Sequence, residues 1–472
     1  MKYNTPGVYI EEIPKLPPSI AQVETAIPAF IGYTEKAIDE RTGEELLLEP
    51  KRIRSLLEYE RLYGMPAVET GLKVKIEDPE SPTPVIQPSI DKALESKYKM
   101  YYALQMFFAN GGGPCWIVAV GDYSSGVVSN DALEDGLNAT EKIDEITLYL
   151  YPDAQGIVDQ ASFYGLYSAT LDMCAELQDR FAVIDIWPDP QNPDIIDHVE
   201  GLRSDQGGIT GEEDTLKYGA AYFPNLETTL NYYYGGEGPG DGNVTIEGTG
   251  ITAANLADLK TENNALYFQA QNALRILPME MPPSPGVVGQ YATVDNARGV
   301  WKAPANVGVD LAIRPMVKIT DKQQQGLNVH VNGGKSVNAI RSFVGRGSAI
   351  IWGARTLAGN SNEWRYVSVR RFFNMVEESV KKATIQFVFE PNDINTWSRV
   401  KSMIDNFLVQ QWRAGALMGT TPEEAFFVKV GLNETMDEVD IWEGRMIVEI
   451  GMAVVRPAEF IILRFSHKML SE

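Results

Sequence analysis

Residues 97–121 read KYKMYYALQMFFANGGGPCWIVAVG, a stretch that joins a helical pattern to a strand pattern. Tyr101, Leu104 and Phe107 recur at the spacing of one apolar helix face. Three consecutive glycines then end the helix, because glycine readily adopts the left-handed backbone that helix ends need. The apolar run at 115–120 is typical of a strand covered on both faces. The stretch therefore predicts a helix that leads directly into a buried strand.

The same alternation continues along the chain. ITLYLYPDA at 146–154 is strand-like, FYGLYSATLDMCAELQD at 163–179 is helical, and RFAVIDIWPDP at 180–190 is strand-like again. Strands that alternate with helices at this spacing indicate an α/β layer with at least partly parallel strands. We therefore expect a multi-domain protein of the α/β or α+β class.

The proline-rich stretches indicate where the domains meet. PKLPPSIAQVE at 14–24 follows a short strand-like segment, and LPMEMPPSPG at 277–286 favours a domain junction. The expected division is an N-terminal arm and linker at 1–24, an α/β region at 25–285, a C-terminal domain at 286–455 and a C-terminal arm at 456–472.

Composition excludes several classes of partner. The 472 residues carry 41 Lys or Arg against 64 Asp or Glu, and the net charge of −23 repels nucleic acid and anionic membrane surfaces. No apolar run approaches the roughly 20 residues that span a bilayer, and we expect a chain made in a cytosol, without membrane insertion. Cys115 and Cys174 lie in apolar surroundings, where buried free thiols are expected and not a disulfide.

The search for catalytic motifs favours no enzyme. His198, His330 and His467 lie outside any nucleophile or metal motif. VHVNGGKS at 329–336 has valine where a phosphate-binding loop needs its first glycine. We expect no catalytic residue, cofactor or metal. An α/β enzyme with a site of unrecognised type stays as the alternative from another class.

One C-terminal helix has a polar face of interest. Within 394–416 the apolar residues Trp397, Val400, Ile404 and Leu408 share one face at helical spacing. The opposite face carries Arg399, Ser402, Asn406 and Arg413. Two exposed arginines on an acidic chain are suited to docking an acidic partner, and an ordinary solvated face explains them equally well.

Several segments, in order along nearly the whole chain, resemble the contractile tail sheath proteins. They are TPGVYIEEI, PPSI and TAIPAFIGYTEKA within residues 5–37, then FFANGGGPCWIVAV, YPDA, KYGAAYFPNL, PPSPGVVGQYATVDNARGVWKAPAN, VNAIRSFVGRGSAIIWGARTL, FEPND and RPAEF. The resemblance implies a C-terminal sheath assembly domain, a peripheral α/β domain of subtilisin-like shape, and extended terminal arms.

The implied function is mechanical. Sheath subunits stack as hexameric rings or a helix around a rigid inner tube, and they shorten to drive that tube through a target envelope. The implied partners are further copies of this chain, the inner tube protein, and baseplate and tail terminator or cap proteins. We further hypothesise that the polar face of the 394–416 helix, with Arg399, Ser402, Asn406 and Arg413, lies toward the tube.

The two ends of the chain are expected to link neighbouring subunits. A strand on a proline-rich tether satisfies its backbone by adding to the edge of another sheet. EFIILRF at 459–465 is nearly continuously apolar, as in a strand buried on both faces. We expect the two strands to pair in a shared intersubunit sheet. The residues concerned are Thr5, Pro6, Gly7, Val8, Tyr9 and Ile10 of the first arm, and Arg456, Pro457, Glu459, Phe460, Ile461, Ile462 and Leu463 of the second.

The type of machine follows from the same resemblance. PPSIAQVETAIPAFIGYTEKA is most similar to the sheaths of extracellular contractile injection particles, and a single chain of 472 residues disfavours secretion systems with a two-protein sheath. The alternative is the tail sheath of a myophage virion. Either way, the resemblance implies assembly in a bacterial cytoplasm as part of a phage-tail-like particle that is released, or of a virion tail.

Overall fold

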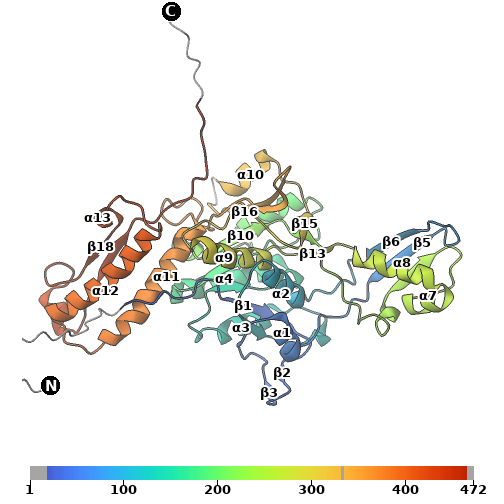
Figure 1. Ribbon diagram of the computed structural model, residues 1–472, viewed down its shortest axis with the longest axis horizontal. Helices are drawn as coiled ribbons and strands as arrows, with labels where there is room; N and C mark the ends of the chain where they lie inside the picture. Colours follow the sequence, from blue (N-terminus) through green and yellow to red (C-terminus); the bar gives the residue numbers. More distant parts are fainter. Residues whose placement is uncertain (1–18, 331–333, 465–472) are drawn as a thin grey trace, which may run out of the picture. The chain divides into compact units, whose positions relative to one another are not determined.

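The computed structural model describes residues 19–330 and 334–464 of the chain (Figure 1). Its contacts divide into two compact units. Unit 1 comprises the described residues up to Val23 together with Met375–Val455, and unit 2 comprises Glu24–Asn374 and the described residues from Arg456 onward.

A nine-stranded sheet forms the centre of unit 2. The six inner strands, from β16 to β7, run parallel, and β14, β17 and β4 join antiparallel at the two edges. The expected partly parallel layer is therefore confirmed. In spatial order the strands are β14 (Val307–Gly308), β17 (Gly347–Ile351), β16 (Val337–Phe343), β10 (Gly219–Phe223), β9 (Phe181–Ile184), β8 (Leu148–Leu150), β1 (Pro28–Gly32), β7 (Cys115–Ala119) and β4 (Lys51–Ile53).

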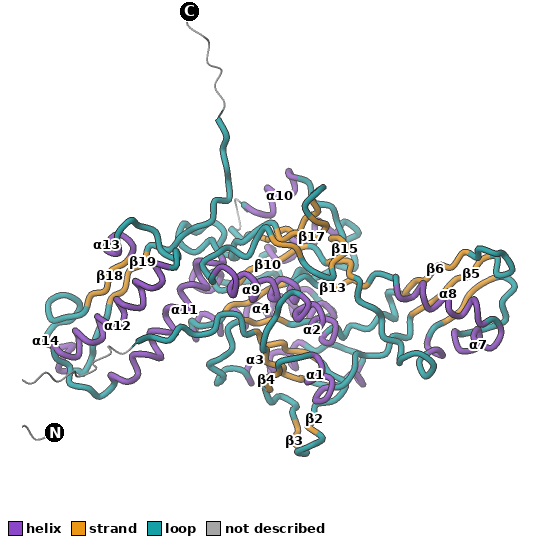
Figure 2. Tube along the Cα trace, in the orientation of Figure 1, coloured by secondary structure: helices purple, strands orange, loops and turns teal. Residues whose placement is uncertain are grey.

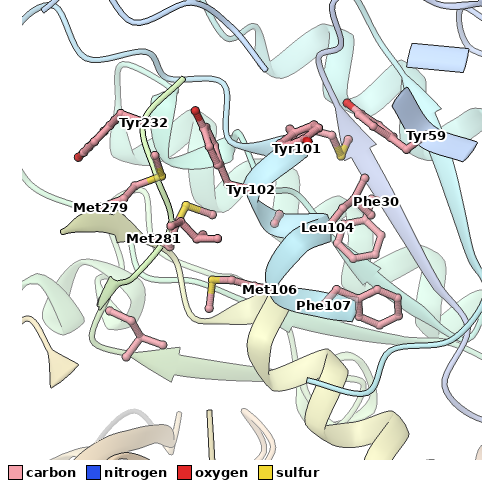
Figure 3. Packing of buried hydrophobic residues seen from close by; sticks show 14 of the residues in the cluster. Phe30, Tyr59, Tyr101, Tyr102, Leu104, Met106, Phe107, Tyr232, Met279 and Met281 are labelled. Atoms are coloured by element: carbon pink, nitrogen blue, oxygen red, sulfur yellow. The ribbon is translucent and has the colours of Figure 1, made fainter. Parts of the chain in front are cut away.

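Helices cover both faces of this sheet, because successive strand side chains point to opposite sides. Phe30 of β1 packs in one core with α2 (Met100–Ala109) and α9 (Ser284–Arg298). Its neighbours Ala29 and Ile31 pack in the other core with α3 (Asn130–Ala139) and α4 (Gln160–Leu177). Figure 3 shows Phe30 beside Leu104 and Phe107 of α2 in the first core.

The stretch at 97–121 folds as expected. Helix α2 leads through Gly111, whose φ is +87°, into β7. Cys115 and Cys174 are both buried and free, as the sequence indicates.

The remaining elements of unit 2 form smaller sheets and short helices (Figure 2). A three-stranded sheet carries helices α7 and α8 in a lobe of its own. The lobe consists of β5 (Leu72–Glu77), β6 (Val85–Ile90), β12 (Thr245–Gly248), α7 (Leu256–Glu262) and α8 (Asn264–Arg275). The other elements are β2 (Ile38–Asp39), β3 (Glu44–Glu45), α1 (Leu56–Tyr63), α5 (His198–Arg203), α6 (Glu213–Leu216), β11 (Leu226–Thr228), β13 (Met279–Met281), β15 (Ala312–Pro315) and α10 (Asp321–Asn328).

Unit 1 is built from helices and one two-stranded sheet. Helix α11 (Val367–Thr384) is continuous across the point where one unit ends and the other begins. Unit 1 further contains α12 (Ile394–Arg413), α13 (Pro422–Ala425), β18 (Phe426–Lys429), α14 (Glu438–Trp442) and β19 (Glu449–Met452).

The compact units do not follow the boundaries expected from the prolines. The cluster at 277–286 leads into α9, whose first turn contains Pro285 and whose first residue, Ser284, donates two hydrogen bonds to buried Asp185. A Cβ added at Gly289 of α9 would lie 2.7 Å from the carbonyl oxygen of Phe107 in α2. These prolines therefore begin a helix of the central core, and the observed division falls after Asn374.

Candidate assembly surfaces

The N-terminal arm residues Thr5, Pro6, Gly7, Val8, Tyr9 and Ile10 lie outside the described residues. The first residue that the structure describes, Ser19, belongs to the linker and to unit 1. Ile20 is buried there, the backbone N–H of Val23 donates to Ser379 Oγ of α11 at 3.1 Å, and Gln411 of α12 donates to Gln22 at 3.2 Å. The end of the linker is thus held in unit 1 by one buried side chain and two hydrogen bonds.

The C-terminal arm forms no strand within the described chain. From Arg456 to residue 464 it runs as an extended loop (Figure 2). Phe460, Ile461, Ile462 and Leu463 are 70–79% exposed. Four consecutive large apolar side chains in water are unfavourable, because burying each one is worth about 1.5–3 kcal/mol. This segment has the composition of a buried strand, and it has no strand partner among residues 19–330 and 334–464.

One residue of the arm is firmly held by unit 2. Glu459 accepts hydrogen bonds from Arg355 Nη2 at 2.6 Å and Nε at 3.0 Å, from Asn328 Nδ2 at 2.6 Å and from the Tyr366 hydroxyl at 3.2 Å. Burial acts to raise the pKa of Glu459, but the hydrogen bonds and charge of Arg355 outweigh it and lower the pKa below the ordinary value. We call Glu459 with Arg355, Asn328 and Tyr366 the arm clamp.

The sequence did not single out the clamp as such. Arg355 belongs to the quoted stretch GARTL and Glu459 to RPAEF, but the two are 104 residues apart and no local pattern connects them. The signal available in the sequence was a lone carboxylate, Glu459, directly ahead of an apolar run. The burial of Arg355 is seen only in the structure.

The two-stranded sheet of unit 1 has open edges among the described residues. β18 pairs with β19 in antiparallel register, from Phe426 opposite Met452 to Lys429 opposite Glu449. After β19 the chain continues beside residues 416–418, where the Val455 N–H donates to the Ala416 carbonyl at 3.1 Å. Each strand of such a pair leaves backbone groups free on its outer side, which favours the addition of further strands.

Helix α12 presents the polar face that the sequence predicts. Val400, Ile404 and Leu408 are buried, together with Met403 and Phe407, and Trp397 is half-buried. Arg399, Ser402, Asn406 and Arg413 are all exposed. The motif FEPND supplies the start of the helix: Asp393 accepts hydrogen bonds from the N–H groups of Asn395 and Thr396, and Asn392 accepts one from Trp397.

The two arginines of this face differ in their surroundings. Arg399 lies 3.6 Å from Glu390 and over the ring of Phe387. Arg413 has no ion-pair partner among the described residues of the chain. The charge of Arg413 is therefore available to pair with an acidic group of another protein.

In the ranges 19–330 and 334–464, no group of three or more His, Cys, Asp or Glu side chains is arranged to hold a metal ion. Within the same ranges, no helix has the length and apolar content needed to cross a membrane.

Comparison with known proteins defines the class. Residues 360–468 match the family model of the phage tail sheath C-terminal domain. Solved structures match nearly the whole chain. The anti-feeding prophage (AFP) helical sheath in the contracted state is 31% identical, with 99% of this chain and 100% of that chain covered and a TM-score of 0.64. The sheath complex of an extracellular contractile injection system, PVC, also in the contracted state, is 30% identical over 99% of each chain, with a TM-score of 0.63.

A chain of the AFP baseplate, resolved with 6-fold symmetry, is 30% identical, with 99% and 100% of the two chains covered and a TM-score of 0.64. The comparison with curated proteins gave no match. At this identity over the full length, the chain belongs to the family of contractile sheath proteins. The match to the PVC sheath supports a sheath of the extracellular contractile injection systems over that of a myophage.

Proposed function

We propose that this chain polymerises helically around an inner tube in an extracellular contractile injection particle and contracts to drive that tube through a target envelope. The observation that carries the proposal is the similarity over 99% of the chain to AFP and PVC sheath chains. Its partners are further copies of itself, an inner tube protein, a baseplate, and a terminator or cap. The particle is assembled in the bacterial cytoplasm and then released, and the chain's role is structural, not catalytic.

Neighbouring subunits are linked by exchange of terminal strands. The exposed apolar segment 460–463 and the open edges of the β18–β19 sheet support this. An arm that adds to such a sheet gains main-chain hydrogen bonds of about 0.5–1.5 kcal/mol each, and it also buries its side chains. The N-terminal arm, Thr5 to Ile10, is proposed to complete the shared sheet together with Arg456–Leu463 of another copy.

The polar face of α12 is proposed to lie against the inner tube. Support comes from the joint exposure of Arg399, Ser402, Asn406 and Arg413 on one face of a helix whose other face is buried. A tube surface with acidic groups at that contact would complement the two arginines.

Deletion of residues 1–18 tests the strand exchange. The deletion removes the arm and keeps buried Ile20, so the variant is expected to fold with unchanged thermal stability as a monomer. Co-expressed with tube and baseplate proteins, the full chain is expected to form long striated cylinders in negative-stain micrographs, and the variant none. A matched control replaces residues 1–18 by a glycine-serine stretch of equal length, which keeps the length but lacks the strand pattern.

Long cylinders formed by the deletion variant would contradict strand exchange. A full-length chain that never forms cylinders with its tube and baseplate would contradict the proposed function itself.

A further inference from the structure

The charge of this chain is unevenly distributed. Residues 296–362 contain nine Lys or Arg and only two Asp, with no Glu, a net charge of +7 in a chain of −23. The nine are Arg298, Lys302, Arg314, Lys318, Lys322, Lys335, Arg341, Arg346 and Arg355. Arg355 is buried in the arm clamp, but the other eight cations still reverse the sign of the charge within an acidic protein, which indicates a surface for an acidic partner.

Part of this segment forms a hairpin, β16 and β17, near one edge of the nine-stranded sheet. The guanidinium groups of Arg341 and Arg346 lie 5.2 and 5.9 Å from the centre of the Phe343 ring, and Val344 at the hairpin tip is 106% exposed. Arg341 pairs with Asp321 at 2.8 Å, next to exposed Lys322. We call Lys322, Arg341, Phe343, Val344 and Arg346 the basic patch.

Two cations of the basic patch are left without a carboxylate. Neither Arg346 nor Lys322 forms an ion pair with any described residue. Arg346 donates instead to the side-chain oxygen of Asn306 and lies over Trp352. Stacking on aromatic rings fixes the arginines in place, so less entropy is lost when they bind a partner.

An acidic counterpart lies in the same unit. The β2–β3 hairpin and the residues after it, 38–49, contain Asp39, Glu40, Glu44, Glu45 and Glu49 against the single cation Arg41. Within the described chain, Glu45 and Glu49 have no cationic partner, and both are exposed. Leu47 and Leu48 are exposed beside them, which gives this segment the same mixture of charge and apolar surface as the basic patch. We call residues 38–49 the acidic hairpin.

The sheet order keeps the two surfaces apart within one chain. β16, which with its following turn and α10 carries the basic patch, lies near one edge of the nine-stranded sheet, and β4, which follows the acidic hairpin, forms the other edge. Strands lie about 4.8 Å apart, so β16 and β4 are separated by roughly 30 Å. Figure 1 shows β2 and β3 on the opposite side of the sheet from β16 and α10. Complementary surfaces at opposite edges can meet only between copies, in a head-to-tail contact that propagates.

We propose that the basic patch of one subunit docks onto the acidic hairpin of the next. This contact rests on the proposed function, because it presumes a lattice of copies. It is separate from the terminal arms, since all of its residues belong to the body of unit 2.

The test is charge reversal followed by a charge swap. Arg346→Glu, and separately Lys322→Glu, are expected to abolish or severely shorten the cylinders formed with tube and baseplate proteins at physiological salt. Lys142→Glu is the matched control, because it makes the same change in net charge at an exposed lysine without an ion pair among the described residues. Both basic-patch variants are expected to keep the thermal stability of the parent chain.

The swap Arg346→Glu with Glu45→Arg in one chain is expected to restore long cylinders, since each contact again joins opposite charges. Normal assembly of Arg346→Glu and Lys322→Glu, or failure of the swap to restore assembly in a folded chain, would overturn the contact and leave the sheath function intact. Absence of cylinders from the parent chain would overturn the sheath function, and the contact with it.

Discussion

Two buried aspartates join strand ends to helix starts in unit 2. Asp153 follows β8 and accepts hydrogen bonds from the N–H groups of Tyr33 and Met100, at 2.7 and 3.1 Å. Asp185 follows β9 and holds the start of α9 through Ser284, at 3.0 Å to its N–H and 2.6 Å to its hydroxyl. Burial raises the pKa of Asp153 to about 6 and that of Asp185 to about 7, because the hydrogen bonds only partly offset the loss of water around the charge.

These raised pKa values determine whether the free energy of unfolding rises or falls with pH. The pKa of Asp185 is higher in the folded chain than in the unfolded chain, so folding favours the protonated form. Its contribution to stability is therefore present at low pH and lost as pH rises through about 7.

We expect Asp185→Asn to remove this dependence. Between pH 8 and pH 6 the parent chain gains about 1 kcal/mol from this group, and the variant does not gain it. The measurement is the free energy of unfolding in urea for both chains at the two pH values. A constant difference between the chains at pH 8 and pH 6 would contradict the assignment.

For the arm clamp, the predicted change of stability with pH has the opposite sign. The pKa of Glu459 is lowered in the folded chain, so the stabilisation from the clamp is present at neutral pH and lost as pH falls through the folded-state value. Glu459→Gln removes the charge at every pH. It is expected to release residues 456–464 and to speed proteolysis there several-fold at pH 7. Glu423→Gln, at an exposed carboxylate of α13, is the control. Equal rates of proteolysis within the arm of both variants would argue against the clamp.

Among the elements, those with local patterns were predicted best. Helix α12 begins at Ile394 as expected, since Asp393 caps it and a regular apolar stripe defines its buried face. β7 follows from an apolar run after glycines. The start of α9 was mistaken for a junction, because a proline in the first turn of a helix looks the same in sequence as a proline in a linker. The arm clamp depends on residues brought together only by the fold, which no local pattern reveals.

The polar face of α12 leads to a prediction about the tube. Arg399→Glu combined with Arg413→Glu is expected to abolish growth of the sheath on preformed tubes, because like charges would then face an acidic tube surface. The control combines Lys142→Glu with Arg275→Glu, two exposed basic residues of unit 2. Sheath length on tubes is measured by electron microscopy. Unchanged length in the α12 variant would show that this face does not serve the tube contact.

At the scale of the whole molecule, the resemblance was more informative than the composition. The alternation of strands and helices predicted an α/β layer. The net charge made nucleic acid and anionic membranes unfavourable partners. Neither predicted that residues 286–374 belong with the earlier part of the chain. The reason is physical: α9 is enclosed by the central core on the same side as α2, and that packing follows from contacts far apart in sequence.

The chain passes between its two compact units at three places, after Val23, inside α11 and after Val455. Unit 1 is thus tethered by three covalent connections, one of them an unbroken helix. Tension in a working assembly is therefore divided among several backbone segments, and no single loop bears all of it. Because the arm clamp holds Glu459 on unit 2, a pull on residues 460–464 is borne by Arg355, Asn328 and Tyr366 before it can strain the β18–β19 pair.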